Sequence, residues 1–317
     1  MKRLSDNKIV LITRSTRLDE LIRRFNTTSQ AQFYIEHLGG NFKAYQEEDT
    51  SYKLAVRETV RVLTQLGRLQ QLDRSFVPNF IFAPDATVVV LGQDGLVANV
   101  LKYLDNQPLI GVNPDKSRWA GVLLPFEVKD LSSILPQVFA KTSALRQVSM
   151  AKARLNTGEV LYGVNDLFIG PKSHISARYR IELAGDAEEQ SSSGIIVSTG
   201  LGSTGWLKSI VAGARGISAF FSGDESLQSM LSQSYDASFP WDADYLYFSV
   251  REPWPSQQFS ARLACGKIGV ETPLIITSQM SEHGVIFSDG IEQDYLPFQA
   301  GSQAIISLAE KKGLLVM

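Results

Sequence analysis

The sequence predicts an α/β N-terminal domain with a parallel sheet, followed by a β-rich, mostly antiparallel second domain. In the first half, short apolar runs alternate with segments of helical spacing, which favours parallel strands covered by helices. Beyond about residue 144, strand-length apolar runs follow one another across short polar turns, which favours antiparallel pairing. A glycine-rich turn follows a β-branched run in each half, as at the end of a buried strand.

Periodicity places the elements of the first half. Continuous apolar runs predict strands at 8–13, 80–82, 87–91 and 109–112. Apolar residues three or four positions apart predict helices at 17–38, 52–72 and 96–104. The polar stretch 26–29 can bend or recap the first helix, and the glycines at 39 and 40 end it.

The second half is predicted to consist mainly of strands. They are expected at 147–155, 160–169, 177–183, 195–197, 245–250, 259–264, 274–277 and 285–287, with one helix at 203–212. The serine-rich stretch 222–238 predicts a surface loop, and the apolar stretch 304–316 a strand or hairpin. We therefore expect an α/β nucleotide-binding domain at 1–143, a β-rich domain at 144–290, and a segment at 291–317 that packs back on the first domain.

Composition narrows the class of protein. A chain of 317 residues suits two domains, and a net charge of −2 argues against broad nucleic-acid binding. The single cysteine, Cys265, excludes an intrachain disulfide, and the three histidines lack metal-binding spacing, so we expect no metal site built from side chains. There is no apolar stretch of membrane-spanning length. We expect a cytoplasmic protein with no membrane partner.

The first glycine-rich turn is Gly92-Gln93-Asp94-Gly95. It has two interpretations. Asp-Gly is a common turn pair, so the segment can be a simple connection between strand and helix. At the carboxyl end of a parallel strand, the same carboxylate can take a proton from a hydroxyl that attacks a phosphoryl group.

The second turn, Gly200 to Gly205, matches the spacing G-x-G-x-x-G of dinucleotide-binding loops. That fingerprint needs a βαβ unit around it, whereas this copy lies in the strand-rich half, so we interpret the match as coincidental. Its hydroxyls can still bind ribose or phosphate, and Trp206 can stack on a base. The hydroxyl-bearing candidates are Thr199, Ser203, Thr204 and Ser209.

Two further dipeptides contain an aspartate. Asn165-Asp166 interrupts an apolar strand, as a bulge or exposed edge would, or as a reader of ribose or base. Asp289-Gly290 lies between two predicted strands and suits a hairpin turn.

Taken in order, these motifs resemble those of the NAD kinase family. That family has a Gly-Gly-Asp-Gly turn, an Asn-Glu pair, a turn similar to Thr-Pro-Thr-Gly-Ser-Thr-Ala-Tyr, and a late Asp-Gly. The chain offers Gly92 to Gly95, Asn165-Asp166, Thr199 to Trp206 and Asp289-Gly290. Stretches 16–34 and 111–121 look closest to the mitochondrial-type branch and its bacterial relatives.

The resemblance implies an NAD kinase-like, ATP-dependent phosphotransferase that makes NADP from NAD, with Mg²⁺ arriving on ATP. Asp94 would act as base or orienter on the accepting 2′-hydroxyl of the adenosine ribose. Gly92, Gln93 and Gly95 would approach the phosphates. The remaining nucleotide-binding residues would be Asn165, Asp166, Thr199, Ser203, Thr204, Trp206 and Ser209. Its partners would be small nucleotides, and the protein would be a homo-oligomer, such as a homodimer.

The chain departs from the family pattern at several positions. Gln93 replaces a glycine, which costs roughly 1 kcal/mol or more if that residue needs a positive φ. Asp166 is one methylene shorter than the family glutamate, and Gly200-Leu201 replaces Pro-Thr. Two alternatives therefore stay open: a weak or inactive homologue that binds NAD(P) or another nucleotide, and a related kinase acting on a sugar or lipid hydroxyl.

Overall fold

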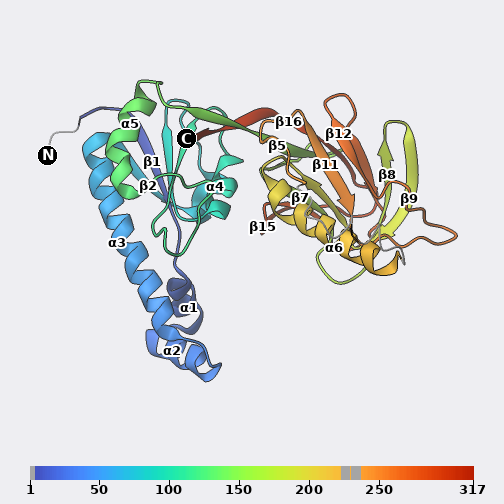
Figure 1. The fold of residues 1–317 in the computed structure, drawn as a ribbon, viewed down its shortest axis with the longest axis horizontal. Coiled ribbons are helices and arrows are strands. Elements are labelled where there is room, and N and C mark those ends of the chain that lie inside the picture. The colour runs from blue at the N-terminus through green and yellow to red at the C-terminus, as the bar shows by residue number, and fades with distance from the viewer. Residues whose placement is uncertain (1–3, 223–228, 230–236) are drawn as a thin grey trace. The chain divides into compact units, whose positions relative to one another are not determined.

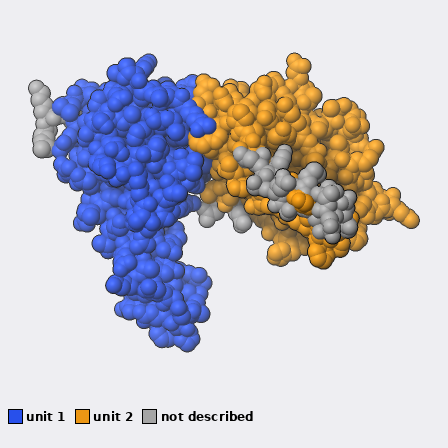
Figure 2. All heavy atoms as spheres, in the orientation of Figure 1, with its two compact units in different colours: residues 1–146, 314–317 blue, residues 147–313 orange. Residues whose placement is uncertain are grey.

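The computed structural model describes residues 4–222, 229 and 237–317. The chain divides into two compact units, which Figure 2 shows in different colours. Unit 1 comprises Met1–Arg146 and Leu314–Met317, and unit 2 comprises Gln147–Gly313. Of the C-terminal segment expected to return to the first domain, only the last four residues belong to unit 1.

Unit 1 is built on a parallel sheet. Its strands are β1 (Lys8–Thr13), β2 (Arg68–Asp73), β3 (Thr87–Leu91) and β4 (Pro108–Val112), with the end of β16 (Gln303–Val316) beside β4. The order is β2-β1-β3-β4-β16, and each neighbouring pair is parallel. Every residue of β3 is buried because helices cover both faces of the sheet.

Helices surround this sheet. They are α1 (Arg17–Phe25), α2 (Thr28–His37), α3 (Phe42–Leu66), α4 (Asp94–Leu101) and α5 (Leu131–Phe139), with short 3-10 turns η1 (Arg74–Asn79) and η2 (Val128–Asp130). Buried side chains of α3 and α5 share one core with β1, β3 and β4. In Figure 1, α1 and α2 pack together at the start of α3, where they bury a small core of their own.

Capping explains the break between the first two helices. Thr16 and Asp19 form a reciprocal capping box at the start of α1, and Asn26 ends that helix at a φ of 66°. Thr27 then caps α2 by accepting a hydrogen bond from the Gln30 amide. The predicted recapping near residues 26–29 is confirmed.

Unit 2 contains two packed sheets. The first has the order β16-β13-β8-β9, with β5 paired to β16 and β6, and the second has the order β12-β11-β10-β7-β14-β15. Their bounds are β5 (Leu145–Leu155), β6 (Val160–Gly163), β7 (Asp166–Pro171), β8 (Ala177–Leu183), β9 (Asp186–Ser192), β10 (Ile195–Ser198), β11 (Tyr245–Val250), β12 (Cys265–Gly269), β13 (Leu274–Ser278), β14 (Gly284–Ser288) and β15 (Ile291–Pro297). Alternate side chains from both sheets form a common core.

The outer face of the second sheet is covered by α6 (Trp206–Phe221), which follows a 3-10 turn, η3 (Gly202–Thr204). Ile196 and Val285 pack under this helix with Trp206 and Ile210. Each recorded pair within the second sheet is antiparallel. The predicted fold class, a parallel α/β part followed by an antiparallel β-rich part, is confirmed.

Several predicted elements are wrong, and the reasons are local. The helix predicted at 52–72 begins earlier and ends at Leu66, and Gly67 releases the chain into β2. Residues 80–82 form no strand because the chain leaves η1 there, and the strand predicted at 259–264 lies instead at β12. The strand predicted at 160–169 is divided into β6 and β7 by a bend at 164–165.

The expected surface loop at 222–238 lies largely outside the described residues. Within the described part of the chain, the search for a helix long and apolar enough to cross a bilayer found none.

Candidate functional site

The carboxyl ends of β1 and β3 meet at the point where the strand order of unit 1 reverses. The chain passes from β1 to β2 on one side, and then returns to place β3 on the other side of β1. Open α/β sheets bind ligands outside the carboxyl ends of the strands at such a switch point. Arg14 follows β1 here, and Gly92, Gln93 and Asp94 follow β3.

Asp94 is the first residue of α4 and is half-buried. Its carboxylate accepts a hydrogen bond from the Leu123 amide at 2.8 Å and another from the Val122 amide at 3.3 Å. Two backbone donors on a carboxylate restrict its orientation but leave other lone pairs available. The geometry therefore holds one carboxylate at the start of a helix, where its dipole favours negative charge.

The loop that supplies these amides has its own supports. Asn113 donates to the Trp119 carbonyl and accepts from the Asp115 amide, both at 2.9 Å. Gly121 has a φ of 67°, which favours glycine. A side chain at Gly111 would place its Cβ 1.9 Å from the Leu123 carbonyl oxygen. The stretch compared with the family at 111–121 thus builds the support for Asp94.

Gln93 has an ordinary backbone conformation. It is the N-cap of α4 with φ −131° and ψ 166°, which any residue adopts. Because φ is negative, Gln93 does not cause the destabilisation that a glutamine at a positive φ would cause. A Cβ at Gly92 would meet the Leu96 side chain at 2.8 Å, whereas a Cβ at Gly95 would meet open space.

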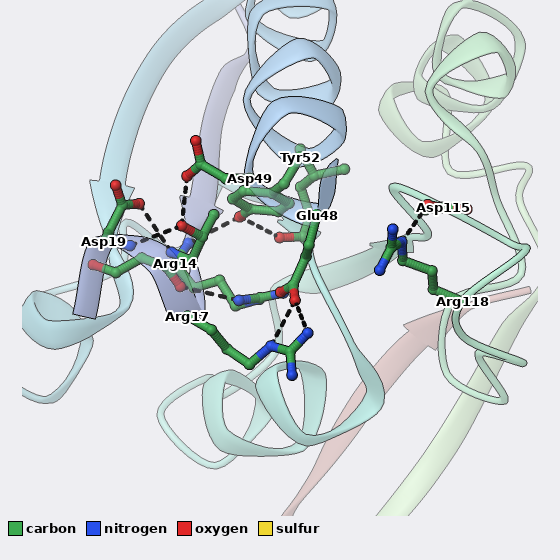
Figure 3. Close-up of polar contacts among 11 residues, drawn as sticks. Arg14, Arg17, Asp19, Glu48, Asp49, Tyr52, Asp115 and Arg118 are labelled. Atoms are coloured by element: carbon green, nitrogen blue, oxygen red, sulfur yellow. Dashed lines mark hydrogen bonds and ion pairs between the residues drawn. The ribbon is translucent and has the colours of Figure 1, made fainter. Parts of the chain in front are cut away.

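A cluster of arginines at the same edge was missed by the sequence reasoning (Figure 3). Glu48 of α3 is buried and binds both Arg14, at 3.2 Å, and Arg17, at 2.5 Å. The Tyr52 hydroxyl accepts from the Arg14 amide and donates to the Leu91 carbonyl, both at 3.0 Å, which ties the ends of β1 and β3 together. The feature of the sequence that could have revealed this cluster is a pair of arginines three residues apart, directly after a buried strand.

In this arginine cluster two guanidinium groups share the Glu48 carboxylate, while the neighbouring Asp19 and Asp49 are paired with Lys53. The side chain of Arg14 is 8% exposed and lies 4.9 Å from the centre of the Tyr52 ring and 5.7 Å from that of Trp119. Arg17 is 54% exposed. Arg17 is therefore the member that can reach an anion in solution.

In unit 2, the structure brings Asp289 to the Asn165-Asp166 pair. Asp289 lies in the turn between β14 and β15 with a φ of 55°. Its carboxylate accepts from the amides of Val164 at 3.0 Å, Asn165 at 2.6 Å and Asp166 at 3.4 Å. The hairpin-turn interpretation of Asp289-Gly290 is confirmed, and that turn also shapes the segment that precedes β7.

Asp166 is buried at the start of β7. Burial, together with the negative charge of Asp289, raises the pKa of Asp166 from 3.8 to about 7. Near neutral pH this carboxyl group exists both as a hydrogen-bond donor and as an acceptor. A group of this kind suits the recognition of a hydroxyl on a ligand.

The second glycine-rich turn is built on internal contacts. The hydroxyl of Thr199 donates to the Val164 carbonyl at 2.5 Å and accepts from the Gly202 amide at 3.2 Å. The hydroxyl of Ser203 donates to the Gly200 carbonyl at 2.7 Å. Cβ atoms at Gly200 and Gly202 would lie 1.8 Å from the Pro240 oxygen and 2.0 Å from the Asn165 oxygen. Close backbone packing explains both glycines.

The strand before this turn, β10, is antiparallel to both of its neighbours. The G-x-G-x-x-G match is therefore not in a βαβ unit, which agrees with its interpretation as coincidental. Thr204 and Ser209 are exposed, and Trp206 is half-buried, stacked on Phe168 with ring centres 5.9 Å apart. These three side chains are therefore accessible to a ligand.

Among the described residues there is no group of three or more His, Cys, Asp and Glu arranged to hold a metal ion. Comparisons by sequence found no relatives: no protein-family model matches the chain, and no curated protein matches it.

Solved structures do resemble this chain. The crystal structure of yeast NADH kinase in complex with NADH matches with a TM-score of 0.57 and 16% identity, covering 99% of this chain and 84% of that one. An NAD kinase from Archaeoglobus fulgidus in complex with ATP matches with a TM-score of 0.54 and 14% identity, covering 98% and 93%. The chain therefore has an NAD kinase-like fold, which confirms the resemblance found in the motifs at the level of the fold.

Proposed function

We propose that this protein is an NAD kinase-like phosphotransferase that moves the γ-phosphate of ATP to the 2′-hydroxyl of the adenosine ribose of NAD. The observation that carries the proposal is Asp94, a carboxylate fixed at the switch point of the parallel sheet. The fold supports it, because the similar structures include an NADH kinase with NADH and an NAD kinase with ATP.

Asp94 acts as the base in this proposal. As the hydroxyl oxygen of the ribose attacks the γ-phosphorus, the Asp94 carboxylate takes its proton, and ADP leaves with the electrons of the broken P–O bond. The amides of Leu123 and Val122 keep the carboxylate from rotating away. Its position at the start of α4 also places backbone N–H groups near the reacting phosphate.

The guanidinium groups at the same edge are suited to the phosphates of ATP. Arg17, with its exposed guanidinium group, is proposed to contact them, while Glu48 holds it in place. Mg²⁺ is proposed to enter with ATP and to neutralise charge on the transferred phosphoryl group.

Unit 2 is proposed to bind the nucleoside. Asp166, whose pKa of about 7 lets it donate or accept, pairs with a ribose hydroxyl or a ring nitrogen. Asn165 offers an amide beside it, and Trp206 presents a half-buried ring for stacking. Thr199 and Ser203 support the turn from inside, and Thr204 and Ser209 offer exposed hydroxyls.

The direct test is incubation with ATP, Mg²⁺ and NAD, with NADP measured by an NADP-specific dehydrogenase. The variant Asp94→Asn is expected to lower the rate by about 10²–10⁴-fold, because it removes the base while keeping the shape of the side chain. The matched control is Asp85→Asn, at a surface residue paired with Lys8, which is expected to keep the rate. Formation of NADP at equal rates by Asp94→Asn and the parent protein contradicts the role of Asp94.

Two other activities give different results in the same assay. A binding protein without transfer is stabilised by NAD, with a higher Tm, and makes no NADP. That alternative was motivated in part by Gln93, and the extended conformation of Gln93 removes the backbone argument for it. A kinase for a sugar or lipid hydroxyl consumes ATP at a rate that NAD does not raise.

A further inference from the structure

Residues 113–124 form a loop, which we call the Asp94 loop because its Val122 and Leu123 amides donate to the Asp94 carboxylate. The buried Leu123 side chain anchors the end of this loop. Its middle is exposed from residue 116 to residue 120, except at Trp119, which is half-buried. The contacts of Trp119 therefore decide how firmly the middle of the loop is held to the rest of unit 1.

Trp119 packs against the guanidinium group of Arg14. The central carbon of that group lies 5.7 Å from the centre of the Trp119 ring and 4.9 Å from the centre of the Tyr52 ring. A guanidinium group within about 6 Å of a ring centre is attracted to the face of the ring, and more strongly where water is excluded. Because the Arg14 side chain is only 8% exposed, this contact joins the Asp94 loop to the end of β1 and to α3.

Arg14 is itself held firmly, as Figure 3 shows for its contacts with α3. Its Nη2 donates to Glu48 at 3.2 Å and its Nη1 donates to the Ser15 carbonyl at 3.0 Å. Within the part of the chain that the structure describes, its buried Nε has no hydrogen-bond partner. Apolar residues in place of a buried ion pair often leave stability unchanged or raise it. The buried charge of Arg14 is therefore explained better by what it holds than by stability.

A second link from the same loop to α3 is weaker. Arg118 lies 3.8 Å from Glu47, and the two side chains are 30% and 55% exposed. An ion pair of this kind is screened by water and contributes little. Of the two neighbouring residues, Trp119 therefore makes the stronger link.

We propose that Trp119 is a positioning residue for phosphate transfer. Its ring holds the middle of the Asp94 loop against Arg14, so that the Val122 and Leu123 amides keep the Asp94 carboxylate turned toward the attacking hydroxyl. Trp119 itself touches no reacting atom. The inference rests on the proposed function, because it assigns Trp119 a part in orienting the proposed base.

Hydrogen exchange of the full-length protein, read by mass spectrometry, tests the link without any turnover. Trp119→Ala is expected to speed exchange in the peptide that carries the Val122 and Leu123 amides by at least about tenfold, because the contact with a buried cation is lost. Trp119→Phe keeps a ring on Arg14 and is expected to retain most of the protection. The matched control is Lys116→Ala in the same loop, whose partner is Glu127 at 2.7 Å, and it should leave the exchange unchanged. Peptides from unit 2 should exchange alike in all four proteins, which separates a local change from global unfolding.

Steady-state formation of NADP tests the consequence for the reaction. Trp119→Ala is expected to lower kcat by about 10- to 10²-fold through misplacement of the base, and to leave the KM for NAD unchanged. If Trp119 acts through Asp94, the loss disappears once Asp94 is replaced. The double variant of Trp119→Ala with Asp94→Asn should therefore be as active as Asp94→Asn alone.

Three results overturn the proposal: unchanged exchange of the Asp94 loop in Trp119→Ala, an equal increase in Trp119→Phe, or a further fall in kcat in the double variant. Absence of NADP formation by the parent protein contradicts the proposed function instead. In that case the exchange measurement still decides whether Trp119 holds the loop.

Discussion

The two glycine-rich turns follow buried strands in different units and use glycine for different reasons. At Gly200 and Gly202 the glycines allow two segments of backbone to pack in direct contact, and the hydroxyls of Thr199 and Ser203 are bonded internally. At Gly95 there is open space where a side chain would lie, and Asp94 is half-buried at a helix start. The turn in unit 1 therefore combines a carboxylate with unoccupied space beside its backbone.

This difference teaches that a glycine pattern by itself does not locate chemistry. The turn in unit 2 has the better match to a known fingerprint, but its glycines and hydroxyls serve mainly to pack and hydrogen-bond the turn within its own fold. The turn with the poorer match, which has Gln93 in place of a glycine, lies at the switch point of the parallel sheet. The variants below can break or sharpen this contrast.

The largest effect is expected from Gly200→Ala or Gly202→Ala. Each new Cβ would lie within about 2 Å of a backbone oxygen, so the free energy of unfolding should fall by more than about 4 kcal/mol. Gly95→Ala is the matched control and should raise it by about 0.5–1 kcal/mol, since Gly95 lies in α4. Urea denaturation measures both. A Gly200→Ala protein as stable as the parent contradicts the packing explanation.

The next effect concerns Asp166→Asn. The raised pKa means that the folded state holds a proton which the unfolded chain loses above pH 3.8, so stability falls as pH rises from 3.8 to about 7. The asparagine variant has no carboxyl group at this position, so its stability does not fall in this way. A shift of the pKa from 3.8 to about 7 lowers the free energy of unfolding by at most about 4 kcal/mol above pH 7.

Urea denaturation at pH 5 and pH 8 tests this sign. The stability of Asp166→Asn relative to the parent should rise by about 2–3 kcal/mol between the two values, because the unfolded parent is already ionised at pH 5 while its folded state holds the proton up to about pH 7. Asp186→Asn, at an exposed position in β9, is the control and should show little change. A relative stability independent of pH shows that the pKa of Asp166 is not raised.

A smaller effect is expected from Thr199→Val. The variant keeps the shape but leaves the Val164 carbonyl and the Gly202 amide without the hydroxyl, so stability should fall by about 1–3 kcal/mol. Thr204→Val removes an exposed hydroxyl in the same turn and should change stability by about 0.5 kcal/mol or less. Equal losses in the two variants are inconsistent with an internal role for Thr199. Thermal unfolding with both variants in one buffer gives the comparison.

The smallest effect is expected from Gln93→Gly, which introduces the glycine of the family pattern. Since Gln93 is extended and exposed, the change relieves no strain and only adds freedom to the unfolded chain. Stability should fall by about 0.5–1 kcal/mol. A rise in Tm for this variant would show that Gln93 is strained after all.

The sequence by itself determined the local features of this protein. The apolar runs at β1, β3, β4 and β11 predicted those strands, because a buried strand needs β-branched and large apolar side chains at neighbouring positions in the sequence. The order of the four motifs indicated the family of the fold, and the place of Asp94 after a buried strand made it a candidate site residue. Boundaries such as the end of α3 were missed, since one glycine decided them.

Only the tertiary structure decided what the motifs are used for. The support of Asp94 by Leu123, the contact of Asp289 with Asn165, and the sharing of Glu48 by Arg14 and Arg17 join residues distant along the chain. The backbone of Gln93 also depends on its surroundings, since φ is set by the strand before it and the helix after it. Such contacts follow from strand order and packing, which periodicity along one chain does not encode.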